Sequence, residues 1–391
     1  MWSPYIDFGS GDFYLDARSA YQHLRDNAPV YLDEQHSGLW GVARYDDVIA
    51  VERDPVTFSS AGGSRPDTGP LPWMIDMDGA AHSKRRRLVS HGFTPARVRA
   101  TQPHLRAICD ELIDRVCEAG ACDFVADIAA PLPMIVIGDM LGVPASDRAQ
   151  LLDWSRGMLA SLSGDAAGYE RAAQSFGAYV EYAQAVVADR RSHPRDDLFS
   201  VLVHAEVGGE RLSDDEIVFE SLLLLIGGDE TTRHVAAGGL EQLLLHPEQM
   251  RELRVDPSRL PSAVEEMLRW VSPIKNMART VTTDTVLGGV AIPAGAKLVV
   301  LYESANFDHR QFVTPDQFDV TRQPNDHVAF GFGPHFCLGA ALARMELAVL
   351  FDRLLARLPD LHRPVASNLA RTLAGIERMP LTFSPSAPRT E

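Results

Sequence analysis

The sequence predicts a mostly α protein with a minor β region, an α+β fold class, built as a single domain over residues 1–391. Long segments with apolar residues at helical spacing occupy the middle of the chain. Short alternating segments typical of strands are confined to two places, about residues 28–60 and 279–300. With 391 residues, of which 46% are hydrophobic, the chain can form a large core with room for a buried cofactor.

The predicted elements begin with two short strands and continue with long helices. Residues 30–32 and 39–43 are predicted as strands, and helices are predicted over residues 97–118, 172–191 and 213–245. The last helix opens with Ser-Asp-Asp-Glu, a capping box. At 1.5 Å per residue this helix is roughly 45 Å long, so we expect it to cross the whole molecule.

The C-terminal third of the chain mixes both kinds of structure. Residues 279–300 return to β character with glycine-containing turns, and residues 306–332 show no clear period. A final helix is predicted over residues 338–358, followed by a short β-like tail.

Charge and composition exclude several classes of protein. The net charge of −16 argues against nucleic acid as a partner, because phosphate binding needs a basic surface. We expect a cytoplasmic protein without a membrane span, since no signal peptide and no apolar stretch of ~18 residues is visible. Cys109, Cys117 and Cys122 lack the paired spacing of a zinc site, and the first two fall in a predicted helix, where small buried side chains are expected.

The fourth cysteine lies in a different setting, a loop that runs from Phe330 to Gly339 with the sequence Phe-Gly-Phe-Gly-Pro-His-Phe-Cys-Leu-Gly. Gly331 permits tight backbone geometry, and Gly339 would let a flat ligand approach the backbone closely. Cys337 stands where a helix is predicted to begin, and there the helix dipole and free N–H groups stabilise a thiolate. The alternative is a structural cysteine at a helix start, which the complete pattern makes a poor explanation.

The long central helix carries Gly227 and Gly228, followed by Asp229, Glu230 and Thr231. Each glycine inside a helix costs about 0.5–1 kcal/mol relative to alanine, so a compensating role is expected. Close helix packing is one explanation. The acid–alcohol pair directly after the glycines changes the balance in favour of a functional role.

These motifs resemble those of the cytochrome P450 superfamily, and the resemblance covers the chain from about Ala17 to Phe383. It implies the P450 fold, a triangular helical prism with haem b buried between the long central helix and the cysteine loop. It also implies dependence on O2 and on electrons from NAD(P)H, delivered through a ferredoxin and its reductase. By this resemblance Cys337 is the axial thiolate ligand of the iron, the metal-binding residue of the chain.

Further roles follow from the same resemblance, position by position. Gly227 would open a groove over the haem, with Thr231 and Glu230 as catalytic residues that pass protons to the oxygen being activated. The other cofactor-binding positions are those that contact the haem propionates or line the loop: His82, Arg86, Arg279, His335, Phe330, Gly331 and Gly339. One departure is the Gly-Ala-Ala sequence before His82, where the family often has Pro-Glu; we expect it to affect the turn more than haem binding.

A Glu-x-x-Arg pair, Glu266 and Arg269, lies between the helix motif and the cysteine loop. Such a pair could be a weak surface ion pair. Its position resembles the buried pair of the family, with Arg322 in the matching place downstream. We therefore assign these residues to folding around haem and not to catalysis.

The segments expected to contact substrate are largely apolar and suit a bulky hydrocarbon. Phrases at residues 60–63, 75–78, 227–234, 275–277 and 304–308 resemble the actinobacterial group that oxidises the terminal methyl of the cholesterol side chain. This implies hydroxylation at C26/C27 of cholesterol or cholest-4-en-3-one, and onward oxidation to the carboxylic acid. The predicted substrate contacts are Trp73, Met74, Ile75, Ile226, Gly228, Ile274, Lys275, Asn276, Met277 and Ile376.

Other functions remain open at this point. The substrate could be another terpenoid, a fatty acid or a secondary metabolite. A haem peroxygenase would not need the relay of Glu230 and Thr231, and a haem-based ligand sensor, the non-enzyme alternative, would not need an axial thiolate with a relay.

The expected protein partner is a small ferredoxin on the proximal face, and the chain itself is expected to be a monomer. Lys84, Arg85 and Arg87 surround His82 and Arg86 on one predicted helix, so some of them should point outward. A basic patch there would attract an acidic ferredoxin.

Overall fold

The computed structural model describes residues 5–66, 68–159, 166–364, 370–372 and 375–389. Helices dominate, and the short strands pair mainly in one small sheet, which confirms the predicted α+β class. The helices are α1 (Gly11–Leu15), α2 (Arg18–Asn27), α3 (Tyr45–Arg53), α4 (Gly79–Ser90), α5 (Pro95–Ala100), α6 (Gln102–Cys117), α7 (Pro131–Leu141), α8 (Arg148–Leu159), α9 (Ala166–Ser192), α10 (Leu198–His204), α11 (Asp214–Leu245), α12 (Pro247–Val255), α13 (Leu260–Val271), α14 (Tyr302–Asn306) and α15 (Ala340–Arg357).

The strands bring together segments far apart in the sequence. Five of them form a sheet in the order β1-β2-β8-β5-β3, in which β2 and β8 are parallel and the other pairs antiparallel. The two predicted β regions thus both contribute strands to one sheet, while β6 and β7 of the second region pair only with each other. The strands are β1 (Val30–Leu32), β2 (Trp40–Val42), β3 (Phe58–Ser59), β4 (Ala121–Asp123), β5 (Asn276–Val281), β6 (Thr285–Leu287), β7 (Val290–Ile292), β8 (Lys297–Leu301), β9 (Ala370–Thr372), β10 (Gly375–Arg378) and β11 (Pro380–Thr382).

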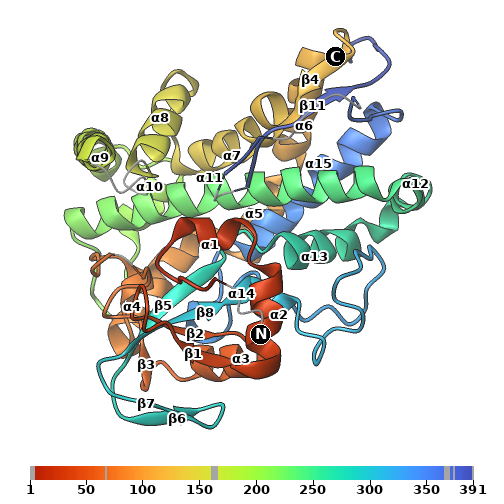
Figure 1. Ribbon diagram of the computed structural model, residues 1–391. Coiled ribbons are helices and arrows are strands. Elements are labelled where there is room, and N and C mark those ends of the chain that lie inside the picture. Colours follow the sequence, from red (N-terminus) through yellow and green to blue (C-terminus); the bar gives the residue numbers. More distant parts are fainter. Residues whose placement is uncertain (1–4, 67, 160–165, 365–369, 373–374, 390–391) are drawn as a thin grey trace.

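Helix α11 crosses the whole molecule, as predicted, with the sheet and α1–α4 on one side of it in Figure 1 and α6–α9 on the other. Its predicted capping box is present: the Ser213 hydroxyl accepts from the Glu216 N–H, and the Glu216 carboxylate accepts from the Ser213 N–H at 2.8 Å. The two reciprocal bonds satisfy donors that a helix start otherwise leaves free.

The predicted helix over residues 97–118 is instead two helices. Helix α5 ends at Ala100 and α6 begins at Gln102, with Pro103 in the first turn of α6. Proline fits a first helical turn but interrupts a helix interior, because it lacks an N–H and its ring clashes with the preceding turn. The final helix begins at Ala340, two residues later than predicted.

The two largest clusters of buried apolar side chains meet along α11. The N-terminal half of α11 contributes Leu222 and Leu225 to a cluster with α7, α9 and α10. Its C-terminal half contributes Val235 and Leu240 to a cluster with α6, α13 and α15. Between these halves lies Gly227, which is exposed although it sits near the middle of the longest helix. An exposed glycine at that place indicates an open space beside α11.

Candidate active site

The cysteine loop is folded tightly onto α3 and leads into α15. Gly331 and Gly333 both have φ of 68°, a region that other residues adopt rarely. A Cβ on Gly333 would lie 2.3 Å from the carbonyl oxygen of Glu52, so only glycine fits there. The Cys337 N–H donates to the Phe330 carbonyl at 2.9 Å. The loop thereby presents the Cys337 side chain just before the first turn of α15.

Opposing effects act on the Cys337 thiol. Burial raises its pKa, while the N–H groups of Gly339 and Ala340 and the charges of Arg86 and Arg344 act in the opposite direction. The sulfur lies at a helix N-terminus with free N–H groups, as predicted, and the two arginines were not part of that prediction. A thiol that coordinates a metal loses its proton to solvent, so these donors would then face a thiolate.

Four of the predicted propionate-binding side chains gather beside this loop. The rings of His82 and His335 are in contact, with centroids 4.2 Å apart and planes tilted by 34°. Arg86 donates to the carbonyl of Phe336, the residue before Cys337. Burial, together with the nearby charge of Arg279, lowers the pKa of His335 to about 3. The ring contact and this charge effect both indicate that His82, Arg279 and His335 lie close together.

One atom of this cluster has no protein partner. His82 is 3% exposed, and its Nε2 makes no hydrogen bond among the described residues. Burial and the charge of Arg86 lower the pKa of His82, so the ring is neutral and carries one N–H. An anionic oxygen placed here would accept from that N–H and be close to two arginines. The residues present therefore fit a haem group whose propionates end at this cluster.

Glu52 is a site residue that the sequence analysis missed. Its buried carboxylate accepts from Arg279 Nη2 at 2.6 Å and from the Tyr302 hydroxyl at 3.1 Å, and also from the N–H of Phe332. Glu52 thus joins α3, the sheet and the cysteine loop, and it holds the Arg279 guanidinium. No local pattern around Glu52 signals this, because its partners are at least 227 residues away.

The central helix presents its alcohol beside the open glycine. The Thr231 hydroxyl donates to the Gly227 carbonyl at 2.9 Å. A Cβ added to Gly227 would meet nothing within 4 Å, whereas one added to Gly228 would lie 3.0 Å from Ile137 on α7. The two glycines therefore differ: Gly227 borders open space, and Gly228, a predicted substrate contact, packs against a neighbouring helix.

The structure identifies the partners of Glu230, which the sequence left open. Glu230 pairs with Arg233, and His234 Nε2 lies 3.2 Å from its carboxylate. Burial acts to raise the pKa of Glu230, but His234 and Arg233 outweigh it and the pKa is lowered. His234 was not predicted, although its i, i+4 spacing from Glu230 on one helix face could have indicated it.

The neighbouring acid, Asp229, lies in a different environment. It is fully buried, and neither carboxylate oxygen has a hydrogen-bond partner among the described residues. Burial, with the charge of Glu230, raises its pKa to about 7. Burial, and then the charge of Asp229, raise the pKa of Glu346 on α15. The surroundings of the two adjacent acids therefore shift their pKa values in opposite directions.

The predicted substrate contacts come from separate segments that the fold arranges around α11. Met74 lies in a short 3-10 helix, η1 (Met74–Asp76), and packs with Ile226 in one apolar cluster. Ile274 and Met277 pack against the apolar side of the sheet, and Ile376 on β10 lies in the cluster of α6, α11 and α15.

The three polar members of that set make specific hydrogen bonds or strand pairs. Trp73 Nε1 donates to the Asp76 carboxylate at 2.7 Å. Lys275 Nζ donates to the Val271 carbonyl at 2.9 Å and lies 3.1 Å from Glu303. Asn276 begins β5, where it pairs with the end of β8. The ammonium of Lys275 is therefore already bound by protein groups.

The Glu-x-x-Arg pair is fully buried, as the resemblance implied. Arg269 and Glu266 form a bidentate pair at 2.8 Å, and Arg322 Nε donates to the same carboxylate at 3.1 Å. Arg269 also donates to the carbonyls of Asn306 and Pro315. These contacts tie α13 to the segment without regular structure before the cysteine loop, which is a structural role.

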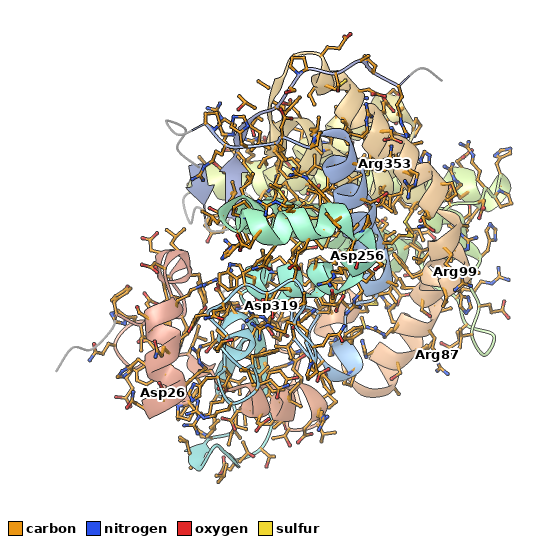
Figure 2. All side chains as sticks on the ribbon, turned by 90° about the vertical axis from the view of Figure 1, so that its right-hand side faces the viewer. Asp26, Arg87, Arg99, Asp256, Asp319 and Arg353 are labelled. Atoms are coloured by element: carbon orange, nitrogen blue, oxygen red, sulfur yellow. The ribbon has the colours of Figure 1, made fainter. Side chains whose placement is uncertain are left out.

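Of the three basic residues on α4 expected near the partner surface, Arg85 does not point outward. Its side chain is buried and forms ion pairs with Glu216 and Glu220 on α11, because α4 turns this face toward the long helix. Lys84 pairs with Glu210. Arg87 is exposed at the outer edge of the molecule, and Figure 2 shows it on the same side as Arg99.

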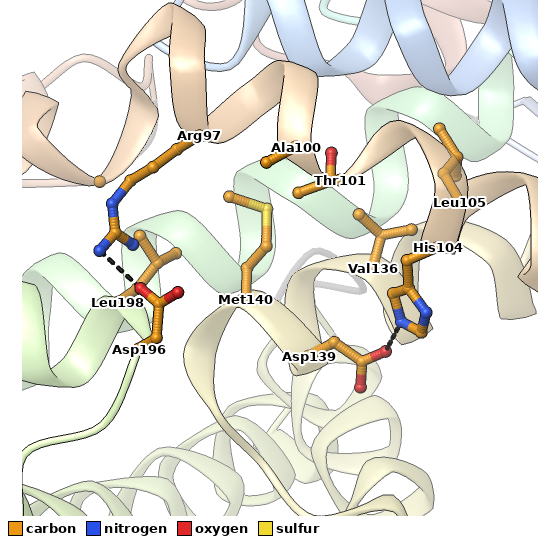
Figure 3. A pocket seen from close by; sticks show the side chains of 11 residues that line it. Arg97, Ala100, Thr101, His104, Leu105, Val136, Asp139, Met140, Asp196 and Leu198 are labelled. Atoms are coloured by element: carbon orange, nitrogen blue, oxygen red, sulfur yellow. Dashed lines mark hydrogen bonds and ion pairs between the residues drawn. The ribbon is translucent and has the colours of Figure 1, made fainter.

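A separate hollow of about 280 Å³ lies between α5, α6 and α7, away from the residues described so far. None of the predicted site residues lines it. Figure 3 shows that its charged side chains face one another: Arg97 pairs with Asp196 and His104 with Asp139, both at 2.7 Å. With its charges paired in this way, the hollow offers no free charged group to a ligand.

Within the described part of the chain, none of the helices combines the length and apolar character that crossing a bilayer requires.

Comparisons with known proteins agree with this geometry. Residues 134–359 match the family model described as "Cytochrome P450". The chain is 53% identical over 393 residues to a steroid C26-monooxygenase of Mycolicibacterium smegmatis, covering 98% of both chains. It is 51% identical over 395 residues to one of Mycobacterium tuberculosis, covering 99% of both.

Among solved structures, CYP109E1 from Bacillus megaterium in complex with testosterone matches with a TM-score of 0.86 and 33% identity, covering 94% of this chain and 99% of that one. P450BioI, solved with an acyl carrier protein that carries hexadec-9Z-enoic acid, matches with a TM-score of 0.89 and 30% identity over 95% of this chain and 99% of that one. The fold, the cysteine loop and these likenesses agree, and the chain belongs to the cytochrome P450 family.

Proposed function

We propose that this protein is a haem-thiolate monooxygenase that hydroxylates the terminal methyl group, C26 or C27, of cholesterol or cholest-4-en-3-one. The observation that carries the proposal is the identity of 53% and 51%, over nearly the full length, with two steroid C26-monooxygenases. Continued oxidation of the alcohol to the carboxylic acid is part of the proposal.

In this proposal haem b would be held by two groups of residues, Cys337 in the cysteine loop and the cluster that binds the propionates. Cys337 would ligate the iron, and His82, Arg86, Arg279 and His335 would bind the propionates. When bound, haem supplies the oxygen chemistry, which electron donation from a thiolate would favour. Phe330, Gly331 and Gly339 would line the haem on the loop side and Gly227 on the side of α11, where a side chain would otherwise occupy the open space.

The proposed work of the protein is to deliver protons and exclude water. Thr231 holds a hydroxyl beside the Gly227 carbonyl, and Glu230 is kept ionised by Arg233 and His234. An ionised carboxylate one residue before the alcohol can take protons from solvent and pass them to that hydroxyl. Both groups would thus act at the edge of the open space beside Gly227.

A sterol would enter this space with its side chain first. The opening at Gly227 suits a thin alkyl end, and the apolar residues Met74, Ile274 and Met277 would surround the tail and rings. Burying an eight-carbon tail would contribute several kcal/mol, at ~0.8 kcal/mol per CH2, without a specific polar contact. Terminal attack follows, since only the chain end would reach the oxidant, although secondary and tertiary C–H bonds further along are weaker.

Turnover of cholest-4-en-3-one with a ferredoxin, its reductase and NADH should therefore yield the C26 or C27 alcohol and then the acid. The product is identified by mass spectrometry and NMR. Testosterone, which lacks the side chain, is the matched control and should not be oxidised at a comparable rate. Oxidation on the rings of cholest-4-en-3-one, or the absence of binding by any sterol that carries a side chain, would refute this orientation.

Electrons are proposed to come from a small acidic ferredoxin that binds near the cysteine loop. Arg86 links α4 to this loop, and the adjacent Arg87 points to solvent. A cation there would attract an acidic partner on a chain whose net charge of −16 would otherwise repel it.

Arg87→Glu should slow reduction of the haem by ferredoxin, and more strongly at low ionic strength, because the Debye length shrinks from about 30 Å at 0.01 M salt to about 10 Å at 0.1 M. Stopped-flow reduction under CO measures the rate. Arg99→Glu makes the same charge change on α5, further from Arg86, and is the control. Equal reduction rates for wild type and Arg87→Glu at low salt would exclude this docking position.

A further inference from the structure

The segment proposed to form one wall of the substrate space is organised by a buried carboxylate. The Asp76 side chain accepts from the N–H groups of Ser64 and Leu71, each at 2.8 Å, and from Trp73 Nε1 at 2.7 Å. These bonds gather Ser64, Leu71 and Trp73 around Asp76. Two more bonds tie the segment to its neighbours: the Ala278 N–H donates to the Ser64 carbonyl at 2.8 Å, and Arg85 Nη1 donates to the Pro72 carbonyl at 3.5 Å. A further attachment, to α11, comes from another group.

Glu220 on α11 provides that attachment. One of its carboxylate oxygens, Oε1, accepts from the Met74 N–H at 2.8 Å and from Arg85 Nη1 at 3.0 Å. Glu220 is fully buried, and its second oxygen, Oε2, has no partner among the described residues. Burial raises its pKa to about 7, even though Arg85 acts to lower it. A buried carboxylate with one oxygen unsatisfied is costly, so its position should matter.

Arg85 is held independently of this bond. Its Nη2 pairs with Glu216, one helical turn before Glu220 on α11, and Glu216 belongs to the capping box. Arg85 would therefore stay against α11 if Glu220 were replaced, and no arginine would be left buried without a partner. The Met74 N–H, in contrast, would lose its acceptor.

We propose that Glu220 is a positioning residue for substrate specificity, which fastens the 72–76 segment to α11 and so sets how the wall formed by Trp73, Met74 and Ile75 meets a long apolar substrate. Glu220 stands seven residues, nearly two turns, before Gly227, so the two share a helix face about 10 Å apart. The inference rests on the proposed function, because that function makes this segment a substrate wall. Loss of the bond at Met74 would loosen the wall where it meets α11 without altering the cysteine loop or the relay.

The test uses the full-length holoenzyme with three substitutions. Glu220→Met removes the acceptor and keeps an apolar side chain of similar length. Glu220→Gln keeps an acceptor oxygen and should restore most of the wild-type behaviour. Glu216→Gln, the matched control, weakens the other partner of Arg85 without touching Met74. Hydrogen exchange by mass spectrometry reports on peptides that cover residues 71–77, and spectral titration gives the Kd for cholest-4-en-3-one and for imidazole.

In Glu220→Met, exchange in this peptide should be about tenfold faster, the effect of losing one charge-assisted hydrogen bond. The Kd for cholest-4-en-3-one should rise by a similar factor, while imidazole, too small to reach the segment from the iron, should bind as in wild type. If Glu220→Met does not bind haem, Glu220→Leu takes its place, because leucine likewise offers the Met74 N–H no acceptor.

If hydrogen exchange in residues 71–77 is as slow in Glu220→Met as in wild type, Glu220 does not fasten this segment to α11. Faster exchange with an unchanged sterol Kd would overturn the role in specificity. If wild-type protein binds no sterol, the proposed function fails instead, and the exchange data still decide whether Glu220 fastens the segment.

Discussion

Replacing Cys337 by histidine is expected to abolish the thiolate signature in the spectrum of the reduced, CO-bound protein, together with monooxygenation. Imidazole is a neutral ligand, so the electron donation that a thiolate supplies to the haem iron would be lost. Haem itself can remain bound, because His82, Arg86, Arg279 and His335 form a cluster that does not depend on the sulfur. Product formation from cholest-4-en-3-one should fall to background while haem content stays measurable.

The matched control is Cys122→Ser, which changes another cysteine in β4, outside the loop. It should leave both the spectrum and the activity as in wild type. Retention of the thiolate spectrum and of turnover by Cys337→His would show that the iron ligand is another residue.

Thr231→Ala is expected to separate electron use from product formation. The substitution removes the hydroxyl beside Gly227 but no group of the haem cluster, so substrate binding and NADH oxidation should continue. Protons would no longer reach the site when they are needed. Electrons from NADH would then be used to form hydrogen peroxide instead of product. Because general acid–base groups contribute about 10²–10⁴-fold, product per NADH should fall by about tenfold or more.

The measurement is the ratio of product and of hydrogen peroxide to NADH consumed. Thr231→Ser keeps the hydroxyl and should remain close to wild type, which separates the loss of the group from a change in packing. Glu230→Gln should slow turnover as well, since it removes the carboxylate that Arg233 and His234 hold ionised. An unchanged ratio of product to NADH in Thr231→Ala would contradict the relay.

Features that the sequence by itself determined are those encoded within a short stretch of chain. The capping box at Ser213 defines where α11 begins, and its apolar spacing defines its length. The cysteine loop is equally local, because positive φ at Gly331 and Gly333 and the following helix together place Cys337. Turn, cap and helix signals act over a few residues, so they can be read without knowing which elements pack together.

The tertiary structure alone decided which face of each element meets which neighbour. Arg85 is buried against α11 and does not point to solvent, and Gly228 packs on Ile137 while Gly227 borders open space. Arg279 is held by Glu52, 227 positions away. The helical periodicity of a sequence predicts which face of a helix is apolar. It does not predict the direction from which another helix or loop approaches that helix. These contacts join residues far apart in the chain, and they exist only once the packing of α3, α4 and α7 around the sheet and α11 is complete.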